Sequence, residues 1–182
     1  MALRIEDILH LYKTQGSAMY GGEDVTQLEH ALQCARLAEE GDCGPELIVA
    51  CLLHDIGHLV ATRVGRPAEA DDVHQYMAVP FLRGLMPAAV LEPIRLHVDA
   101  KRYLCYADAP YWASLSPASK RSLELQGGIF DADGARGFLQ QAHAEDAILL
   151  RRFDDLAKDP ARAAPRLSHF EPLLRACTMQ PA

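Results

Sequence analysis

Apolar residues recur every three to four positions along most of the chain, which is the spacing typical of helices packed on a core. Between residues 25 and 40, Leu28, Ala31 and Leu32 share one face. Gly41 then provides a stop signal. No segment alternates apolar and polar residues for long enough to predict a strand, so we expect an all-α fold. The predicted helices cover residues 5–14, 25–40, 45 up to HDIGH, 74–84, 87–100, 117–126 and 134–157, with loops at 15–24 and 61–73.

Composition narrows the class of protein. The chain has 182 residues, 49% of them hydrophobic, which suits one compact domain over residues 1–182. No apolar run approaches the roughly 18 residues of a membrane span, and Glu6 and Asp7 stand where a signal peptide would be apolar. We therefore expect a cytoplasmic protein with no membrane partner. A net charge of −7 without a basic stripe argues against nucleic acid, and five cysteines without a CxxC pair argue against a disulfide framework.

The segment CLLHDIGHLV, residues 51–60, places His54 beside Asp55 in an apolar stretch. Burying a polar group without a partner costs on the order of 1–3 kcal/mol, and a bound metal would offset that cost. Adjacent residues of a helix point in different directions, so both side chains reach one ion only near a helix end, which Gly57 favours. Asp55 has two oxygens and could bridge two ions. A zinc pair of the HExxH type is the other interpretation of His54 and His58, but Asp55 stands where that motif needs glutamate.

Four further residues join this pair to form a predicted metal centre. Each falls on a segment expected to be helical, and a helical bundle can direct such side chains to one point. They are His30, His74, His97 and Asp154. Taken singly, each histidine could equally be an ordinary core or surface residue, and we interpret His10, His143 and His169 in that way.

The pattern His30…His54-Asp55…Asp154 resembles the HD-domain superfamily of metal-dependent phosphohydrolases, and the two inserted histidines resemble its dinuclear branch. Three further stretches are similar to the 2-amino-1-hydroxyethylphosphonate dioxygenase family of mixed-valent di-iron oxygenases, which cleave a carbon–phosphorus bond. They are YGGEDVTQLEHALQCA (20–35), HVDAKRYL (97–104) and SPASKRSLELQGG (116–128). The resemblance runs from about residue 20 to 155 and implies a single HD-domain helical bundle.

The resemblance also implies how two iron ions, Fe(II) and Fe(III), would be held. His30, His54, Asp55 and Asp154 would hold one iron. His74 and His97 would hold the second, with Asp55 bridging. In RRFDD the aspartate directly after the aromatic residue matches the family, which favours Asp154 over its neighbour. Imidazole and carboxylate ligands suit iron and manganese alike, so the ligands alone do not select the metal.

Candidate hydrogen-bond donors for a phosphonate dianion lie three or four residues from the predicted metal ligands, on the same helical faces. Lys101 follows His97 by one helical turn, and Arg151 precedes Asp154 by three residues. Ser119 and Ser122 lie three apart, and the resemblance adds His58 to this substrate-binding set. Ordinary surface charge is the alternative for the lysine and the arginine.

The glycine-rich loop before residue 30 has a predicted gating role. In the family, the residue matching Tyr20 coordinates an iron until substrate arrives, and the residue matching Glu23 moves with it. Gly21 and Gly22 would give that loop its backbone freedom. Glu23 or Asp24 could meet a substrate amine. Whether that amine is primary or trimethylated stays open, because nothing places the aromatic candidates Tyr20, Tyr103, Tyr106 and Trp112.

Together these features predict an iron-dependent dioxygenase. It would use O2 to split a 1-hydroxy-2-(amino or trimethylammonio)ethylphosphonate into phosphate and a carboxylic acid, glycine or glycine betaine. The alternative is an HD-type phosphohydrolase of a small phosphoester that uses Mn or Mg. A non-catalytic ligand sensor with the same fold is a third hypothesis. The oligomeric state stays open.

Overall fold

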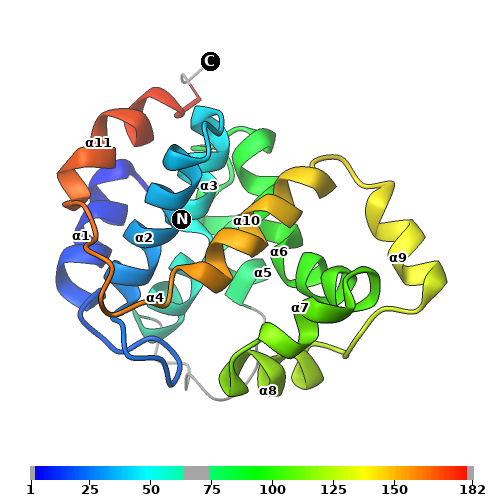
Figure 1. Cartoon of the computed structure of the whole chain (residues 1–182). Coiled ribbons are helices and arrows are strands. Elements are labelled where there is room, and N and C mark those ends of the chain that lie inside the picture. Colours follow the sequence, from blue (N-terminus) through cyan, green and yellow to red (C-terminus); the bar gives the residue numbers. More distant parts are fainter. Residues whose placement is uncertain (1–2, 64–73, 180–182) are drawn as a thin grey trace.

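The computed structural model describes residues 3–63 and 74–179, with the backbone alone described at 61–63 and 74–76 (Figure 1). Within these ranges the chain is helical and contains no β-strand, only two isolated bridges. The prediction of an all-α fold is confirmed. The helices are α1 (Ile5–Gln15), α2 (Gln27–Glu40), α3 (Pro45–Leu53), α4 (Ile56–Arg63), α5 (His74–Leu82), α6 (Ala88–Ala107), α7 (Ala109–Ser114), α8 (Pro117–Leu125), α9 (Ala132–Leu139), α10 (Ala144–Leu156) and α11 (Leu167–Ala176).

Four helices, α2, α3, α6 and α10, form the centre of the molecule. Helix α10 packs against α6, α2 and α3, while α3 also contacts α2 and α6. Residues 47–53 of α3 are all buried, because a helix with neighbours on every side must be apolar all round. The main core reaches from Leu3 near one end of the chain to Cys177 near the other.

Helices α7, α8 and α9 lie on one side of α10, and α1 and α11 lie on the other (Figure 1). Two small apolar clusters pack α7, α8 and α9 against the rest of the molecule. Phe138 of α9 packs with Leu96 and Ala147, and Leu123 of α8 packs with Leu104 and Tyr111. Helix α8 is thereby fixed beside α6, whose side chains it meets again at the candidate site.

A capping box sets where α2 begins. The Thr26 hydroxyl accepts a hydrogen bond from the Glu29 backbone N–H, and the Glu29 carboxylate accepts one from the Thr26 backbone N–H. Such boxes satisfy the free N–H groups of a first helical turn. The helix therefore begins at Gln27 rather than at Val25, and His30 is held in its first turns.

Several predicted boundaries were wrong. The helix predicted at 134–157 is two helices, because His143 has a left-handed φ of 63°, which a continuous right-handed helix does not allow. The loop predicted at 61–73 begins later, since α4 continues to Arg63, and the rest of that prediction lies outside the described residues. Helix α6 extends to Ala107 instead of ending near residue 100. Helices α7 and α11 were not predicted at all.

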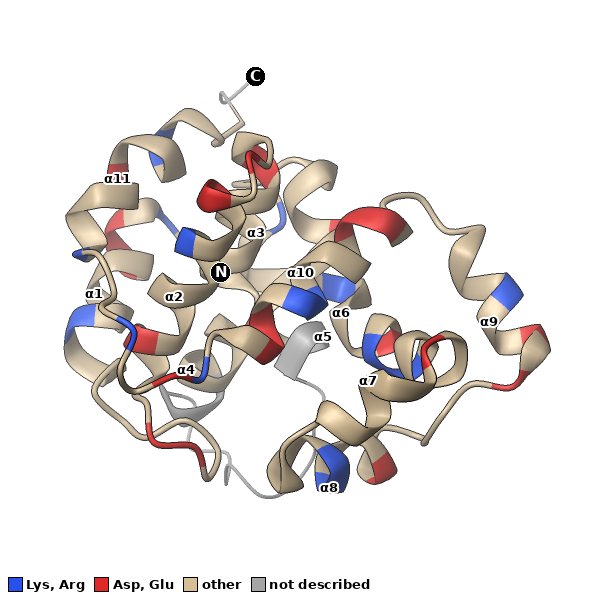
Figure 2. Cartoon of the chain, in the orientation of Figure 1, with Lys and Arg blue, Asp and Glu red and all other residues tan. Residues whose placement is uncertain are grey.

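The length of the helices, the distribution of charged residues and the state of the cysteines can be compared with what the composition predicts. No described helix combines the length and the apolar character that crossing a bilayer requires. Figure 2 shows Lys and Arg spread over many helices and interleaved with Asp and Glu. The five cysteines are all free thiols, four of them buried.

Candidate metal centre

His54 and Asp55 lie at a break between two helices. Helix α3 ends at Leu53 and α4 begins at Ile56, so the pair forms the turn between them. The His58 backbone N–H donates to the Asp55 carbonyl at 3.0 Å, which ties α4 to this turn. Both side chains are buried. The turn lets them face the same point, which adjacent residues of a continuous helix could not do.

Four buried side chains converge beside this turn. The Nε2 atoms of His30 and His54 are 3.2 Å apart, and His30 Nε2 lies 3.4 Å from Asp154 Oδ1. His54 Nε2 lies 3.3 Å from Asp55 Oδ2. Two ligands at right angles on an ion with bonds of about 2.1 Å stand about 3 Å apart. The arrangement therefore fits a single transition-metal ion.

Backbone carbonyl groups orient the three cluster histidines whose side chains the structure describes. The Nδ1 atoms of His30, His54 and His97 lie 2.8, 2.8 and 2.7 Å from the carbonyl oxygens of Ala157, Cys51 and Ile94. A carbonyl oxygen only accepts, so each Nδ1 carries a proton, and Nε2 is the nitrogen that each ring directs toward the cluster. This is the outer support that metal-binding histidines usually have.

Asp55 presents its two oxygens in different directions. Its Oδ2 faces His30 and His54, while its Oδ1 lies 3.7 Å from His97 Nε2. This is the geometry that a bridging carboxylate needs. His74 is the first residue of α5, but its side chain lies outside the described residues, so its part in a second metal position is not tested.

The charges of the cluster also suit a cation. Burial lowers the pKa of His30 to about 4, which keeps that ring neutral. Burial opposes charge on His54 too, but the Asp55 carboxylate outweighs it and raises the pKa of His54 to about 10. A metal ion would displace this proton. Within the described residues, the buried Asp154 Oδ1 accepts no hydrogen bond, as expected for an oxygen that a cation would contact.

Asp154 and Asp155 have different surroundings. Asp154 faces the histidines, and Arg151 Nη1 contacts its other oxygen at 2.7 Å. Asp155 instead pairs with the outer edge of the same guanidinium through Arg151 Nε and Nη2, and Tyr111 donates its hydroxyl to this carboxylate. Although burial opposes ionisation, the Arg151 guanidinium holds the pKa of Asp154 below its usual range. Two carboxylates thus occupy the guanidinium that we expected to bind substrate.

The other predicted phosphonate donors lie between α6 and α8. The Lys101 side chain is only 2% exposed, and its ammonium donates to Ser122 Oγ at 2.8 Å. Ser119, one turn earlier in α8, accepts from Lys158 Nζ at 3.1 Å. Lys158 was not predicted as a site residue. It follows Asp154 by four residues, a spacing that places two side chains on the same face of a helix and that could have indicated it. His58 is half-buried in α4.

The predicted gating loop closes over this cluster. The Tyr20 ring stacks on His30 with centroids 3.9 Å apart. Burial and the nearby Asp55 carboxylate hold the pKa of its phenol well above the usual value, so the phenol keeps its proton. Glu23 accepts a hydrogen bond from Ser116 Oγ at 2.6 Å, directly before α8. Asp24 is exposed, and within the part of the chain that the structure describes its carboxylate makes no hydrogen bond or ion pair with the cluster.

The remaining aromatic candidates have other roles. Tyr103 packs against Phe138, with ring centroids 5.2 Å apart. Trp112 is 47% exposed, and Lys120 Nζ covers its ring at 4.4 Å. Tyr106 is also exposed. Within the described residues, Tyr20 is the one of the four aromatic candidates whose ring stacks on a residue of the metal centre.

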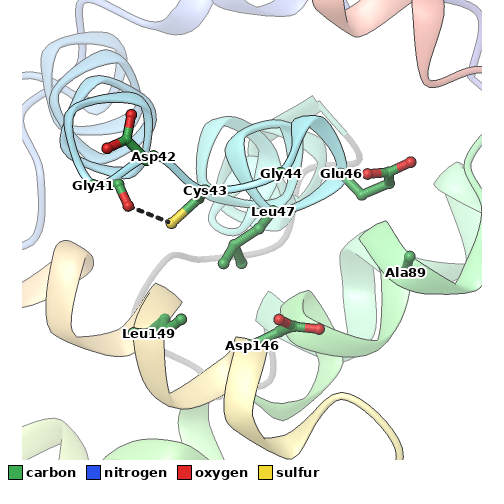
Figure 3. A pocket seen from close by; sticks show the side chains of 9 residues that line it. All are labelled: Gly41, Asp42, Cys43, Gly44, Glu46, Leu47, Ala89, Asp146 and Leu149. Carbon is green, nitrogen blue, oxygen red and sulfur yellow. Dashed lines mark hydrogen bonds between the residues drawn. The ribbon is translucent and has the colours of Figure 1, made fainter.

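A surface pocket of about 350 Å³ lies elsewhere on the molecule (Figure 3). Its lining includes the carboxylates of Asp42, Glu46 and Asp146, and it shares no residue with the histidine cluster. Carboxylates repel a phosphonate dianion, so this pocket does not suit such a ligand.

Comparison with known proteins gives close relatives. A hydroxymethylphosphonate dioxygenase from Gimesia maris is 41% identical over 177 residues, covering 96% of this chain and 88% of the relative. A [1-hydroxy-2-(trimethylamino)ethyl]phosphonate dioxygenase (glycine-betaine-forming) from Leisingera caerulea is 35% identical over 173 residues, covering 94% and 88%. An uncharacterized protein of Acanthamoeba polyphaga mimivirus is 30% identical over 177 residues, covering 93% and 80%. No protein-family model matches the chain. Identity at this level along nearly the whole chain means that the protein belongs to the family of the hydroxyalkylphosphonate dioxygenases.

Proposed function

We propose that this protein is a di-iron oxygenase that uses O2 to cleave the carbon–phosphorus bond of a hydroxyalkylphosphonate. The observation that carries the proposal is the convergence of His30, His54, Asp55 and Asp154, with the second Asp55 oxygen turned toward His97. The names of the two dioxygenase relatives favour oxidation over hydrolysis. If the substrate is hydroxymethylphosphonate, which has one carbon, its reaction with O2 would give formate and phosphate and would need no external reductant.

The ligand set and its surroundings support two adjacent ions. His30, His54 and Asp154 would hold the first ion, and His97, with His74, the second, while Asp55 bridges them. Bound iron would supply the redox chemistry that activates O2 and polarises the substrate hydroxyl. We propose that the single domain spans residues 1–182.

The residues around the cluster would bind and orient the substrate. Lys101, Ser119 and Ser122 would supply hydrogen-bond donors to the dianion. Without it, the Lys101 ammonium donates to Ser122 Oγ, Ser122 Oγ donates to the Ser119 carbonyl, and Ser119 Oγ accepts from Lys158. Arg151 would act chiefly on Asp154, because Asp154 and Asp155 engage its guanidinium. Tyr20 over His30 would keep water and O2 from the metal position until substrate binds.

The substrate is a hydroxyalkylphosphonate of small size. Hydroxymethylphosphonate, 1-hydroxy-2-aminoethylphosphonate and its trimethylammonium analogue are the candidates. Glu23 is the half-buried carboxylate nearest to α8 in the gating loop and would face an amino group if the substrate carries one.

The deciding experiment measures phosphate release from each candidate with iron-loaded protein, in air and under strict anaerobiosis. We expect release to require both iron and O2, with one equivalent of carboxylic acid formed for each phosphate. Deuterium on the hydroxyl-bearing carbon should slow the chemical step. Equal release without O2, or with magnesium as the only metal, would instead establish the phosphohydrolase. Binding of a phosphonate without turnover under every condition would establish the sensor.

A further inference from the structure

The break between α3 and α4 contains no helix-breaking residue. Neither glycine nor proline lies between Pro45 and Gly57, and the residues just before His54 are apolar and compatible with a helix. Helix α3 nevertheless ends at Leu53, and α4 begins at Ile56. The cause of the break therefore lies in side-chain contacts of the folded protein.

Two side chains donate to carbonyl groups at the end of α3. In an uninterrupted helix, the carbonyl groups of Cys51 and Leu52 would accept from the backbone N–H groups four residues later. The last carbonyl groups of a helix lose these partners and need others. Here His54 Nδ1 donates to the Cys51 carbonyl, and the Tyr12 hydroxyl donates to the Leu52 carbonyl.

Tyr12 is the donor that comes from a distant part of the chain. It belongs to α1, and 40 residues separate it from Leu52. Its side chain is 2% exposed and packs in the main core. Burial, and to a smaller extent the Asp55 carboxylate, raises the pKa of its phenol above the usual value. The hydroxyl therefore keeps its proton and remains a donor.

We propose that Tyr12 is a positioning residue for the metal centre. It holds the break between α3 and α4 in place, so that His54 and Asp55 face the same ion. The proposal rests on the metal centre of the proposed function. Leu52 lies two residues before His54, so a shift of its carbonyl group moves both ligands. The second metal position would shift as well, because Asp55 Oδ1 faces His97.

Loss of this hydrogen bond has a defined structural consequence. Without the hydroxyl donor, the Leu52 carbonyl regains a partner if it accepts from the Ile56 backbone N–H, which extends α3 through the turn. Successive side chains of a regular helix point about 100° apart. His54 and Asp55 would then no longer face one ion, although the chain would remain folded.

The test compares Tyr12→Phe, which removes only the hydroxyl group, with a matched control, Ile8→Val. Ile8 lies on the same helix and is fully buried, and its substitution removes apolar volume without removing a donor. A third variant carries 4-aminophenylalanine in place of Tyr12, which restores a hydrogen-bond donor on the same ring. The dissociation constant for Fe(II) is measured without O2 by competition with a chelator, and the free energy of unfolding of each metal-free protein is measured in urea.

We expect Tyr12→Phe to bind iron about tenfold more weakly, at the low end of the effect of losing an outer partner of a metal ligand. Ile8→Val should keep the wild-type dissociation constant, because a loss of stability that leaves the metal-free protein folded does not change its affinity for the metal. The 4-aminophenylalanine variant should bind iron more tightly than Tyr12→Phe.

Three results would overturn the role of Tyr12 while leaving the proposed function intact. The first is a wild-type dissociation constant in Tyr12→Phe. The second is unfolding of metal-free Tyr12→Phe, which would mean that the hydroxyl supports the whole fold and not the turn. The third is equal affinity of Tyr12→Phe and the 4-aminophenylalanine variant, since the donor would then have no effect. If the wild-type protein binds no iron, the proposed function fails, and the role of Tyr12 fails with it.

Discussion

At the scale of single residues, a carbonyl group fixes the proton of each described histidine at the cluster before any metal arrives. Removing one ring should therefore remove one ligand and leave its neighbours in place. We predict that iron-loaded wild-type protein holds about two iron atoms per chain and that His97→Ala holds about one. Elemental analysis after anaerobic desalting measures this directly.

The control for that comparison is His169→Ala. This histidine is exposed and bonds to Glu39, so its loss should leave the iron content unchanged. Asp55→Ala should lose more iron than His97→Ala, because Asp55 faces both positions. Two irons retained in His97→Ala would contradict the assignment of a second position.

The types and spacing of residues predicted most members of this cluster, but not which charged side chains would pair with one another. The aromatic residue before Asp154 marked the correct aspartate to face the histidines, while the sequence could not show that Asp155 and Tyr111 would engage Arg151. Lys158 was missed for a similar reason. A lysine just beyond a helix resembles ordinary surface charge, and Ser119, which it contacts, lies 39 residues away.

At the scale of elements, boundaries were predictable where the sequence carries a local signal. The Gly41 stop after α2 and Pro45 at the start of α3 are such signals. No sequence signal marks the left-handed backbone of His143. The helical spacing of apolar residues continues through this position, so the break before α10 was not predicted. Helix α11 contains Pro172, a residue type that is unfavourable inside a helix, and α7 spans only six residues, so neither has a clear helical signal.

The predicted gating loop should determine which substrates the protein accepts. Glu23 offers oxygen atoms that a primary ammonium can bond to, while a trimethylammonium group has no N–H and prefers aromatic faces. Trp112 and Tyr103 have other partners. We predict that kcat/KM for the trimethylammonium substrate is at least about tenfold lower than for the primary amine, a difference of about 1.4 kcal/mol.

The matched variant is Glu23→Gln, which keeps the shape of the side chain and removes its charge. It should lower kcat/KM for the aminoethyl substrate and change that for hydroxymethylphosphonate much less. Equal losses on both substrates would show that Glu23 acts on the loop and not on the amine. A higher kcat/KM for the trimethylammonium substrate would contradict the predicted order.

At the scale of the whole molecule, the cluster joins parts of the chain that lie far apart in sequence. His30 comes from α2, His54 and Asp55 from the turn after α3, and Asp154 from α10. A metal that binds only the folded chain at about 1,000 times its Kd adds about 4 kcal/mol to the free energy of unfolding. At about 2–4 °C per kcal/mol, removing the metal should lower the Tm by roughly 8–16 °C.

A thermal scan with and without a chelator measures that shift. His30→Ala provides the matched comparison, because a chain that cannot hold the first ion should respond much less to the chelator. His169→Ala should respond like the wild type. Equal Tm values for metal-loaded and metal-free wild-type protein would show that the metal does not tie these helices together.

Backbone hydrogen bonds close the predicted gating loop at its base. Met19 pairs with Thr26, the Tyr20 N–H donates to the Val25 carbonyl, and Gly22 adopts a left-handed φ of 86° inside the loop. The capping box of α2 then begins immediately, so changes within residues 21–24 need not shift His30. These four positions can therefore be replaced as a group without moving the metal-binding side chains. We expect substitutions there, in evolution or in laboratory engineering, to change the range of substrates while the cluster of histidines and aspartates beneath the loop stays unchanged.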